Sequence, residues 1–137
     1  MSEEKLQSDI VRRFSELYPY KKGQLFHVAN ERAHQLQAFK AKSIGIVGGV
    51  SDLIYVCIFG IKCLEIKSYG SRHSISHLIR QVEWGKTIEE VGHQWRLIRT
   101  TQEAIHFING ASYKVGLTTK EVEQLIEENG NKKTIKF

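Results

Sequence analysis

The sequence predicts an α/β protein in which helices flank a mixed central sheet, in the order helix, strand, strand, strand, helix, strand, helix, helix (αβββαβαα). Three observations predict this class: amphipathic segments with apolar residues three and four apart, short β-branched runs between them, and capping residues or glycines at the junctions. The chain has 137 residues, of which 41% are hydrophobic. A chain of this size can bury one core, so we expect a single domain over residues 1–137.

The first helix is predicted from Glu3 to about Tyr18. Ser2 can cap its start, and Pro19, the only proline of the chain, ends it. The residues of its apolar stripe, at helical spacing, are Leu6, Ile10, Phe14 and Leu17. Glu3 and Gln7 continue this stripe, so we expect both to face the protein interior and not solvent.

Three strands and a basic connection follow. A short strand is predicted at Gln24–Val28, and the polar, basic connection after it can hold a helical turn around Arg32–Phe39. A glycine-rich segment, residues 44–49, then leads into a strand at Val50–Ile58. Lys62–Lys67 returns as its antiparallel partner after a turn, so the two strands form a hairpin.

The face of each hairpin residue follows from parity. With an even number of loop residues, paired positions sum to an odd number, so Asp52 shares a face with Glu65 and Lys67. The opposite face is apolar and can pack against helices; it carries Leu53, Tyr55, Cys57, Leu64 and Ile66. The three charged residues are therefore expected to converge on one side of the sheet.

The second half of the chain supplies three more helices and one strand. In order they are a helix from Ser74 or Ser76 to about Val91, a strand at Gln94–Arg99, a helix from Thr100 to near Gly110 and a helix from Thr118 to Gly130. The last two open with the Thr-x-x-Glu pattern of a capping box. In the first, Gln81 lies mid-helix, and the residues expected to face inward are Leu78, Ile79, Val82 and Ile88.

The net charge of +5 comes from 20 Lys and Arg against 15 Asp and Glu. The surplus lies in residues 1–50, with eight basic and five acidic side chains, and in residues 62–99, with seven and four. Such a surplus suits a polyanion such as DNA. No apolar run is long enough for a membrane span or a signal peptide. Cys57 and Cys63 lie in apolar runs and are expected to be free thiols. We therefore expect a cytoplasmic protein with no membrane partner.

Asp52, Glu65 and Lys67 together suit phosphodiester hydrolysis. Two carboxylates at strand ends can hold Mg²⁺, and a lysine on the same face can orient water and stabilise charge on phosphorus. The alternative interpretation is an exposed hairpin that carries a surface ion pair. We favour an active site because both strands are apolar on either side of these charges, and burying an unpaired charge among apolar residues lowers the stability of the fold.

The motifs around these residues resemble the VRR-NUC domain of the PD-(D/E)xK, or restriction-endonuclease-like, nuclease superfamily, in its stand-alone form from phages and bacteria. The resemblance covers most of the chain. The motif residues that carry it are the segment Gly49-Val50-Ser51-Asp52-Leu53, Glu65-Ile66-Lys67, Gln81 with Trp84, Glu3 with Gln7, and Asn30 with Glu31. Ser51 stands where the family often has proline, and the stretch between Lys67 and Gln81 is longer than usual.

The resemblance implies roles for these positions. Asp52, Glu65 and the main-chain carbonyl of Ile66 would bind Mg²⁺ or Mn²⁺, Lys67 and Gln81 would place the attacking water, and Glu3 would join through water or a second metal. No nucleotide cofactor is expected. The candidate DNA contacts that flank this site are Asn30, Arg32, Lys40, Lys42, Arg72 and Arg80.

Three other features have structural alternatives. His73 and His77 have the spacing of a helical metal pair but lack a third zinc ligand, so we expect them to face solvent or phosphate. Trp84 and Trp95 could stack on bases, but both lie on apolar patterns and are expected to pack in the core. Gly48-Gly49 precedes a strand and not a helix, which disfavours a nucleotide-binding loop.

The sequence thus favours a Mg²⁺-dependent endonuclease that acts on branched DNA, such as four-way (Holliday) junctions. The resemblance implies a homodimer, in a bacterial or phage-infected host cell, because family members that cut junctions work as dimers. A sequence-specific endonuclease of the restriction or homing type is an alternative within the same chemistry. A catalytically silent DNA-binding module is the alternative of another class.

Overall fold

The computed structural model describes residues 1–28 and 38–137. Its helices are α1 (Glu3–Leu17), the 3-10 turn η1 (Pro19–Lys21), α3 (Ala38–Ser43), α4 (Ile75–Glu90), α5 (Thr101–Ile108) and α6 (Thr119–Glu128). Its strands are β1 (Leu25–His27), β2 (Leu53–Cys57), β3 (Gly60–Ile66), β4 (Arg72–Ser74), β5 (Gln94–Ile98) and β6 (Thr134–Lys136). The predicted α/β class is therefore confirmed.

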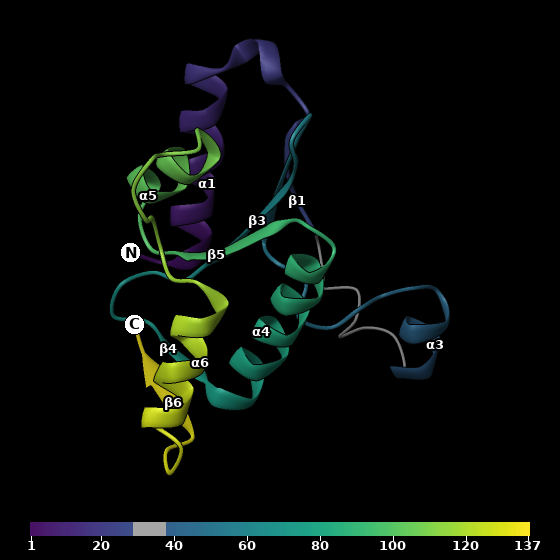
Figure 1. Ribbon diagram of the computed structural model, residues 1–137, viewed down its shortest axis with the longest axis vertical. Coiled ribbons are helices and arrows are strands. Elements are labelled where there is room, and N and C mark those ends of the chain that lie inside the picture. Colours follow the sequence, from purple (N-terminus) through teal and green to yellow (C-terminus); the bar gives the residue numbers. More distant parts are fainter. Residues whose placement is uncertain (29–37) are drawn as a thin grey trace.

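A four-stranded mixed sheet, in the order β1-β2-β3-β5, forms the centre (Figure 1). The first three strands are antiparallel neighbours, whereas β5 runs parallel to β3 because α4 carries the chain back across the sheet. The turn between β2 and β3 has only two residues, Ile58 and Phe59, and Leu53 pairs with Leu64. The two paired residue numbers add up to an odd number, as expected for a turn with an even number of residues. The prediction that Asp52 and Glu65 lie on the same face of the hairpin depends on this register.

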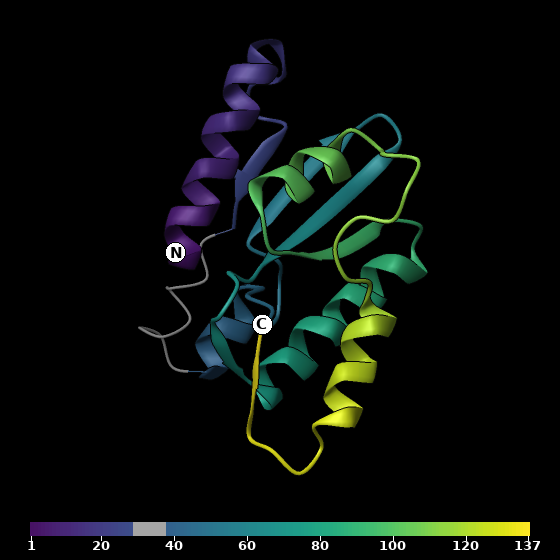
Figure 2. The same ribbon diagram turned by 90° about the vertical axis from the view of Figure 1, so that its left-hand side faces the viewer.

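Helices cover both faces of the sheet. Helices α1 and α5 lie side by side on one face, and α4 lies beside α6 on the other (Figures 1 and 2). The first core contains Leu6, Ile10 and Phe14 of α1, as their spacing predicted, packed on the apolar face of the hairpin. The second core joins Cys63 of β3 and Trp95 of β5 to residues of α4 and α6.

Helix α4 begins at the cap Ser74, whose side chain accepts a hydrogen bond from the His77 amide at 3.1 Å. Leu78 and Val82 are buried as predicted. The expectation that Ile79 faces inward is wrong, because this side chain is 40% exposed. One position along a helix is a turn of about 100°, which carries Ile79 off the narrow buried stripe.

A second, two-stranded sheet was not predicted. After α6 the chain returns as β6 and pairs antiparallel with β4, directly before α4 (Figure 1). His73 is therefore a strand residue and does not share a helix with His77. Its side chain is only 18% exposed and contacts Glu3, so the expectation that His73 faces solvent or phosphate is wrong. Strand β2 begins at Leu53, three residues later than predicted. Helix α3 occupies Ala38–Ser43, and most of the helical turn predicted around Arg32–Phe39 lies outside the described residues.

Candidate active site

Asp52 and Glu65 meet at one end of the hairpin. The register pairs Leu53 with Leu64, so the next pair outward is Asp52 with Glu65. Asp52 is held there because its Oδ2 accepts a hydrogen bond from the Ile66 amide at 2.9 Å. The register of the hairpin thus brings two carboxylates together, and the main chain of β3 holds the Asp52 carboxylate in place.

Lys67 and Glu65 are buried together at the end of β3. Their side chains are 5% and 1% exposed, and Lys67 Nζ lies 3.3 Å from Glu65 Oε1. Glu65 Oε2 is buried and has no hydrogen-bond partner among the described residues. Burial, and then the Asp52 charge, raise the pKa of Glu65 well above its ordinary value, while Lys67 opposes this shift.

Gln81 approaches the same region from α4. Its side chain is buried, and its Oε1 has no hydrogen-bond partner within the described part of the chain. Gly49, three residues before Asp52, packs against the backbone of Arg80 and Gln81. The loop that leads into Asp52 is therefore in direct contact with the helix turn that carries Gln81.

Glu3 lies near the carboxylate pair, at the start of α1. Burial raises the pKa of Glu3, the Lys67 charge lowers it and the Asp52 charge raises it, which places Glu3 within electrostatic reach of both. Its Oε1 lies 2.6 Å from His73 Nε2. Glu3 is thus half-buried against β4, as its place on the apolar stripe predicted, and Glu4 is exposed.

His73 was not expected at this site. The Ser71 hydroxyl donates to the Ser68 carbonyl, so Ser71 Oγ accepts from His73 Nε2 at 2.8 Å. The ring is neutral, because burial and the nearby Lys67 lower the pKa of His73 to about 4. A neutral His73 has one proton on Nε2, which Glu3 Oε1 at 2.6 Å and Ser71 Oγ at 2.8 Å share, so the ring ties the Glu3 carboxylate to the Ser68–Ser71 turn. The β4–β6 pairing places His73 in a strand, where it meets Glu3, and no sequence spacing signalled it.

The donor set fits a hard divalent cation. Among residues 1–28 and 38–137, no three His, Cys, Asp or Glu side chains form a ready metal cage. However, Asp52 and Glu65 are adjacent, and Glu65 Oε2, which has no hydrogen-bond partner among the described residues, is an oxygen that can bind a cation. Mg²⁺ commonly uses one or two carboxylates and keeps several waters, so these residues fit it.

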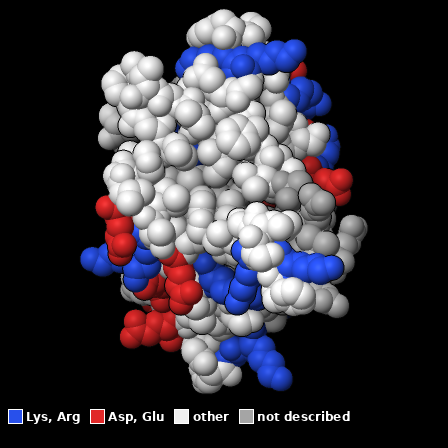
Figure 3. All heavy atoms as spheres, turned by 90° about the vertical axis from the view of Figure 1, so that its right-hand side faces the viewer, with Lys and Arg blue, Asp and Glu red and all other residues white. Residues whose placement is uncertain are grey.

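Basic residues lie on the face that carries α3. Lys40 and Lys42 of α3 and Arg80 of α4 are exposed, and Figure 3 shows Lys and Arg side chains gathered on the lower half of this face. Arg72 of β4 is exposed as well and reaches Thr134. The other two predicted DNA contacts, Asn30 and Arg32, lie outside the described residues.

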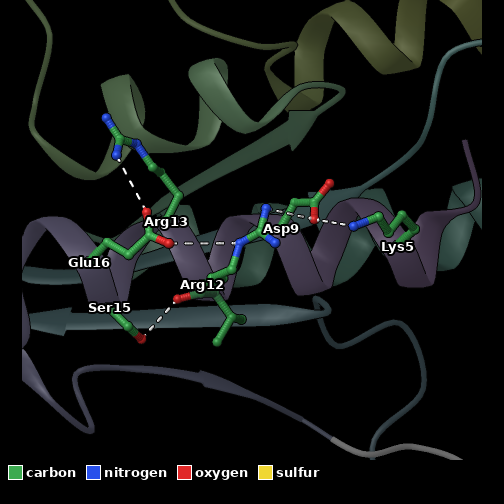
Figure 4. A network of polar contacts seen from close by, with 7 residues as sticks. Lys5, Asp9, Arg12, Arg13, Ser15 and Glu16 are labelled. Atoms are coloured by element: carbon green, nitrogen blue, oxygen red, sulfur yellow. Dashed lines mark hydrogen bonds and ion pairs between the residues drawn. The ribbon is translucent and has the colours of Figure 1, made fainter.

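The outer face of α1 contributes less free positive charge than its composition suggests. Lys5 and Arg12 both contact the Asp9 carboxylate, at 2.7 and 3.3 Å, and Arg12 and Arg13 flank Glu16 (Figure 4). These pairs neutralise one another along the helix. The basic side chains of α1 therefore offer little unpaired positive charge to a polyanion.

Two side interpretations from the sequence are resolved. Trp95 is buried in the second core and Trp84 packs against it, as expected for core residues. Cys57 and Cys63 are free, as expected.

No helix within the described residues is both long and apolar enough to cross a membrane. Comparison with family models, with curated proteins and with solved structures found no match to this chain.

Proposed function

We propose that the protein is a metal-dependent DNA endonuclease of the VRR-NUC type, with a restriction-endonuclease-like fold. The observation that carries the proposal is the buried Glu65 carboxylate, which lies between Lys67 and Asp52 with one oxygen unpartnered. Burying such charges is costly for folding, and perturbed carboxylates of this kind cluster at functional sites. Phosphodiester hydrolysis uses this set of groups.

Asp52, Glu65 and the Ile66 carbonyl would hold Mg²⁺ or Mn²⁺. Bound there, the cation would neutralise a phosphate and lower the pKa of a water molecule. Lys67 supplies a fixed positive charge beside the pair and stabilises charge that develops on phosphorus. Gln81 offers a buried amide oxygen that can accept a hydrogen bond from water, and Glu3, oriented by His73, adds a nearby negative charge.

Branched DNA is the substrate class we favour. The described residues that we propose as DNA contacts are few, namely Lys40 and Lys42 of α3, Arg72 of β4 and Arg80 of α4, which suits contacts to DNA backbones more than the reading of a long base sequence. Cleavage of two strands across a junction needs two active sites, so the proposal includes a homodimer with twofold symmetry. The catalytically silent module is disfavoured because a binding surface alone does not need a buried Glu65 and Lys67.

One comparison tests the proposal. The protein is incubated with a four-way junction and with a linear duplex of the same sequence, in Mg²⁺ or in EDTA. We expect paired cuts in the junction only, dependent on Mg²⁺, and none with Asp52→Asn, which keeps the shape of the side chain. Discrete cuts in the linear duplex indicate a sequence-specific enzyme instead. Binding of either DNA without any cleavage in Mg²⁺ or Mn²⁺ contradicts the nuclease proposal and supports the silent module.

A further inference from the structure

A cavity of about 630 Å³ lies at the other end of the sheet from the candidate active site. Its wall includes the Ile58–Phe59 turn, where β2 and β3 meet, whereas Asp52 and Glu65 lie beyond the opposite ends of these strands. Five residues of β2 separate the two places, which is roughly 17 Å along the strand. The volume falls within the range of about 300–1,000 Å³ that is typical of small-molecule sites.

The charged groups of this cavity are all basic. Lys21 and Lys62 line it, and none of its lining residues, all within the described chain, is Asp or Glu. Lys62 Nζ donates to the carbonyls of Phe107 and Ile108, at 2.8 and 3.2 Å, which uses two of its three N–H groups. Lys21 Nζ donates to the Tyr55 hydroxyl at 3.1 Å. Both ammonium groups are thus held in position by neutral oxygens, and neither is paired with a carboxylate of the described residues.

Two neutral side chains of the wall, His93 and Asn109, are also set to donate. The Ile61 amide donates to His93 Nδ1 at 3.0 Å, so Nδ1 is an acceptor and Nε2 is the ring nitrogen left to donate. The Tyr18 hydroxyl donates to Asn109 Oδ1 at 2.6 Å, which leaves the Asn109 NH₂ group free to act as a donor. A ligand that fills this space meets ammonium and N–H groups, which suits an anion whose oxygens only accept hydrogen bonds.

We propose that this cavity binds a small organic phosphate. The phosphate contacts Lys21 and Lys62, and an apolar ring lies against the Ile58–Phe59 turn, whose side chains are 94% and 89% exposed. Burial, together with the positive charges of Arg96 and Lys21, lowers the pKa of Lys62, and a bound anion relieves that repulsion. The site is separate from the carboxylate pair and does not depend on the nuclease proposal.

The two cysteines provide a direct readout of binding. Cys57 lines the cavity and is partly exposed, whereas Cys63 is fully buried and its pKa is raised to about 12 by burial. Alkylation of the native full-length chain by iodoacetamide is therefore expected at Cys57 and not at Cys63. Adenosine 5′-monophosphate, used as the probe at about 1 mM, should slow alkylation of Cys57 in a saturable manner.

Charge-removing variants and other probes complete the test. Lys21→Met and Lys62→Met should each weaken protection about tenfold, while Lys86→Met, on α4 and outside the cavity, should not. Lys21→Met is decisive if Lys62→Met unfolds, because Lys62 also binds the end of α5. The proposal is overturned if the nucleotide gives no protection at about 10 mM, or if adenosine or inorganic phosphate alone protects equally well. Protection by a single-stranded oligonucleotide alone also overturns it, in favour of a DNA strand.

Discussion

Gly49 lies against the backbone of Arg80 so closely that a Cβ atom on Gly49 would stand 2.5 Å from the Arg80 carbonyl oxygen. The backbone of Gly49 also has φ +83°, in the left-handed region that favours glycine. Asp52 follows three residues later, and Gln81 is the next residue after Arg80. This contact therefore fixes the loop that delivers Asp52 against the helix that delivers Gln81.

Gly49→Ala should lower the free energy of unfolding by about 2 kcal/mol, because the new Cβ meets backbone atoms that cannot rotate away and the residue is strained at positive φ. Gly48→Ala is the matched control, since no atom lies within 4 Å of its Cβ position, and its effect should stay within about 0.5 kcal/mol. Urea unfolding measures both. Equal effects of the two substitutions would show that the close approach to Arg80 does not matter for stability.

Local periodicity explains what the sequence could predict. The pairing of Asp52 with Glu65, and the position of Lys67 at the end of the same strand, follow from a two-residue turn and the alternation of side chains along a strand. The stripe of Leu6, Ile10 and Phe14 likewise follows from helical spacing. These features depend on residues close together in the chain, so they can be inferred without a fold.

The missed features depend on contacts between distant segments. His73 reaches Glu3 because β6, at residues 134–136, pairs with β4, and strands of three residues carry no recognisable period. The contact of Gly49 with Arg80 has the same origin, since a glycine-rich stretch indicates a turn but not the element that approaches it. Such contacts are set by tertiary packing.

Lys67→Met should lower the cleavage rate about a thousandfold and leave Mg²⁺ affinity nearly unchanged, because in the proposed function Lys67, beside Glu65, stabilises charge on phosphorus and holds no metal. Methionine keeps most of the length of the buried side chain. Lys86→Met, which removes an exposed lysine paired with Glu123, is the control and should cleave normally. Single-turnover cleavage and Mg²⁺ titration separate the two effects. If Mg²⁺ binding is lost with the rate, Lys67 serves to hold the carboxylates and has no separate role in the chemistry.

Glu3→Gln should raise the Mg²⁺ concentration needed for half-maximal cleavage, since it removes a negative charge near Asp52. Glu4→Gln, one residue along the same helix and exposed, should behave as wild type. Both residues lie in the first turn of α1, so loss of interaction with the helix dipole, worth at most about 1 kcal/mol, affects the two variants alike. Identical Mg²⁺ titrations for both variants would remove Glu3 from the site.

The carboxyl of Glu65 should make the stability of the metal-free protein depend on pH. Its pKa is raised in the native state, first by burial and then by Asp52. As pH rises above the ordinary value of 4.5, the unfolded chain loses this proton while the native chain still holds it. Stability contributed by the group is therefore present below about pH 4.5 and is lost as pH rises through the raised native pKa.

Glu65→Gln, which cannot ionise, should for this reason be more stable than wild type at pH 7 in EDTA, with the difference narrowing as pH falls toward 4.5. Glutamine keeps an Oε1 atom that can accept a hydrogen bond from Lys67 Nζ, so the contact at 3.3 Å is not simply deleted. Urea unfolding at several pH values measures the difference, and Glu4→Gln, an exposed change, should show none. A Glu65→Gln variant less stable than wild type at every pH would mean that the ion pair with Lys67 outweighs the cost of burial. If Glu65→Gln is more stable at pH 7, the ionised Glu65 carboxylate lowers the free energy of unfolding at neutral pH. That result is expected for a residue whose role is to bind a cation.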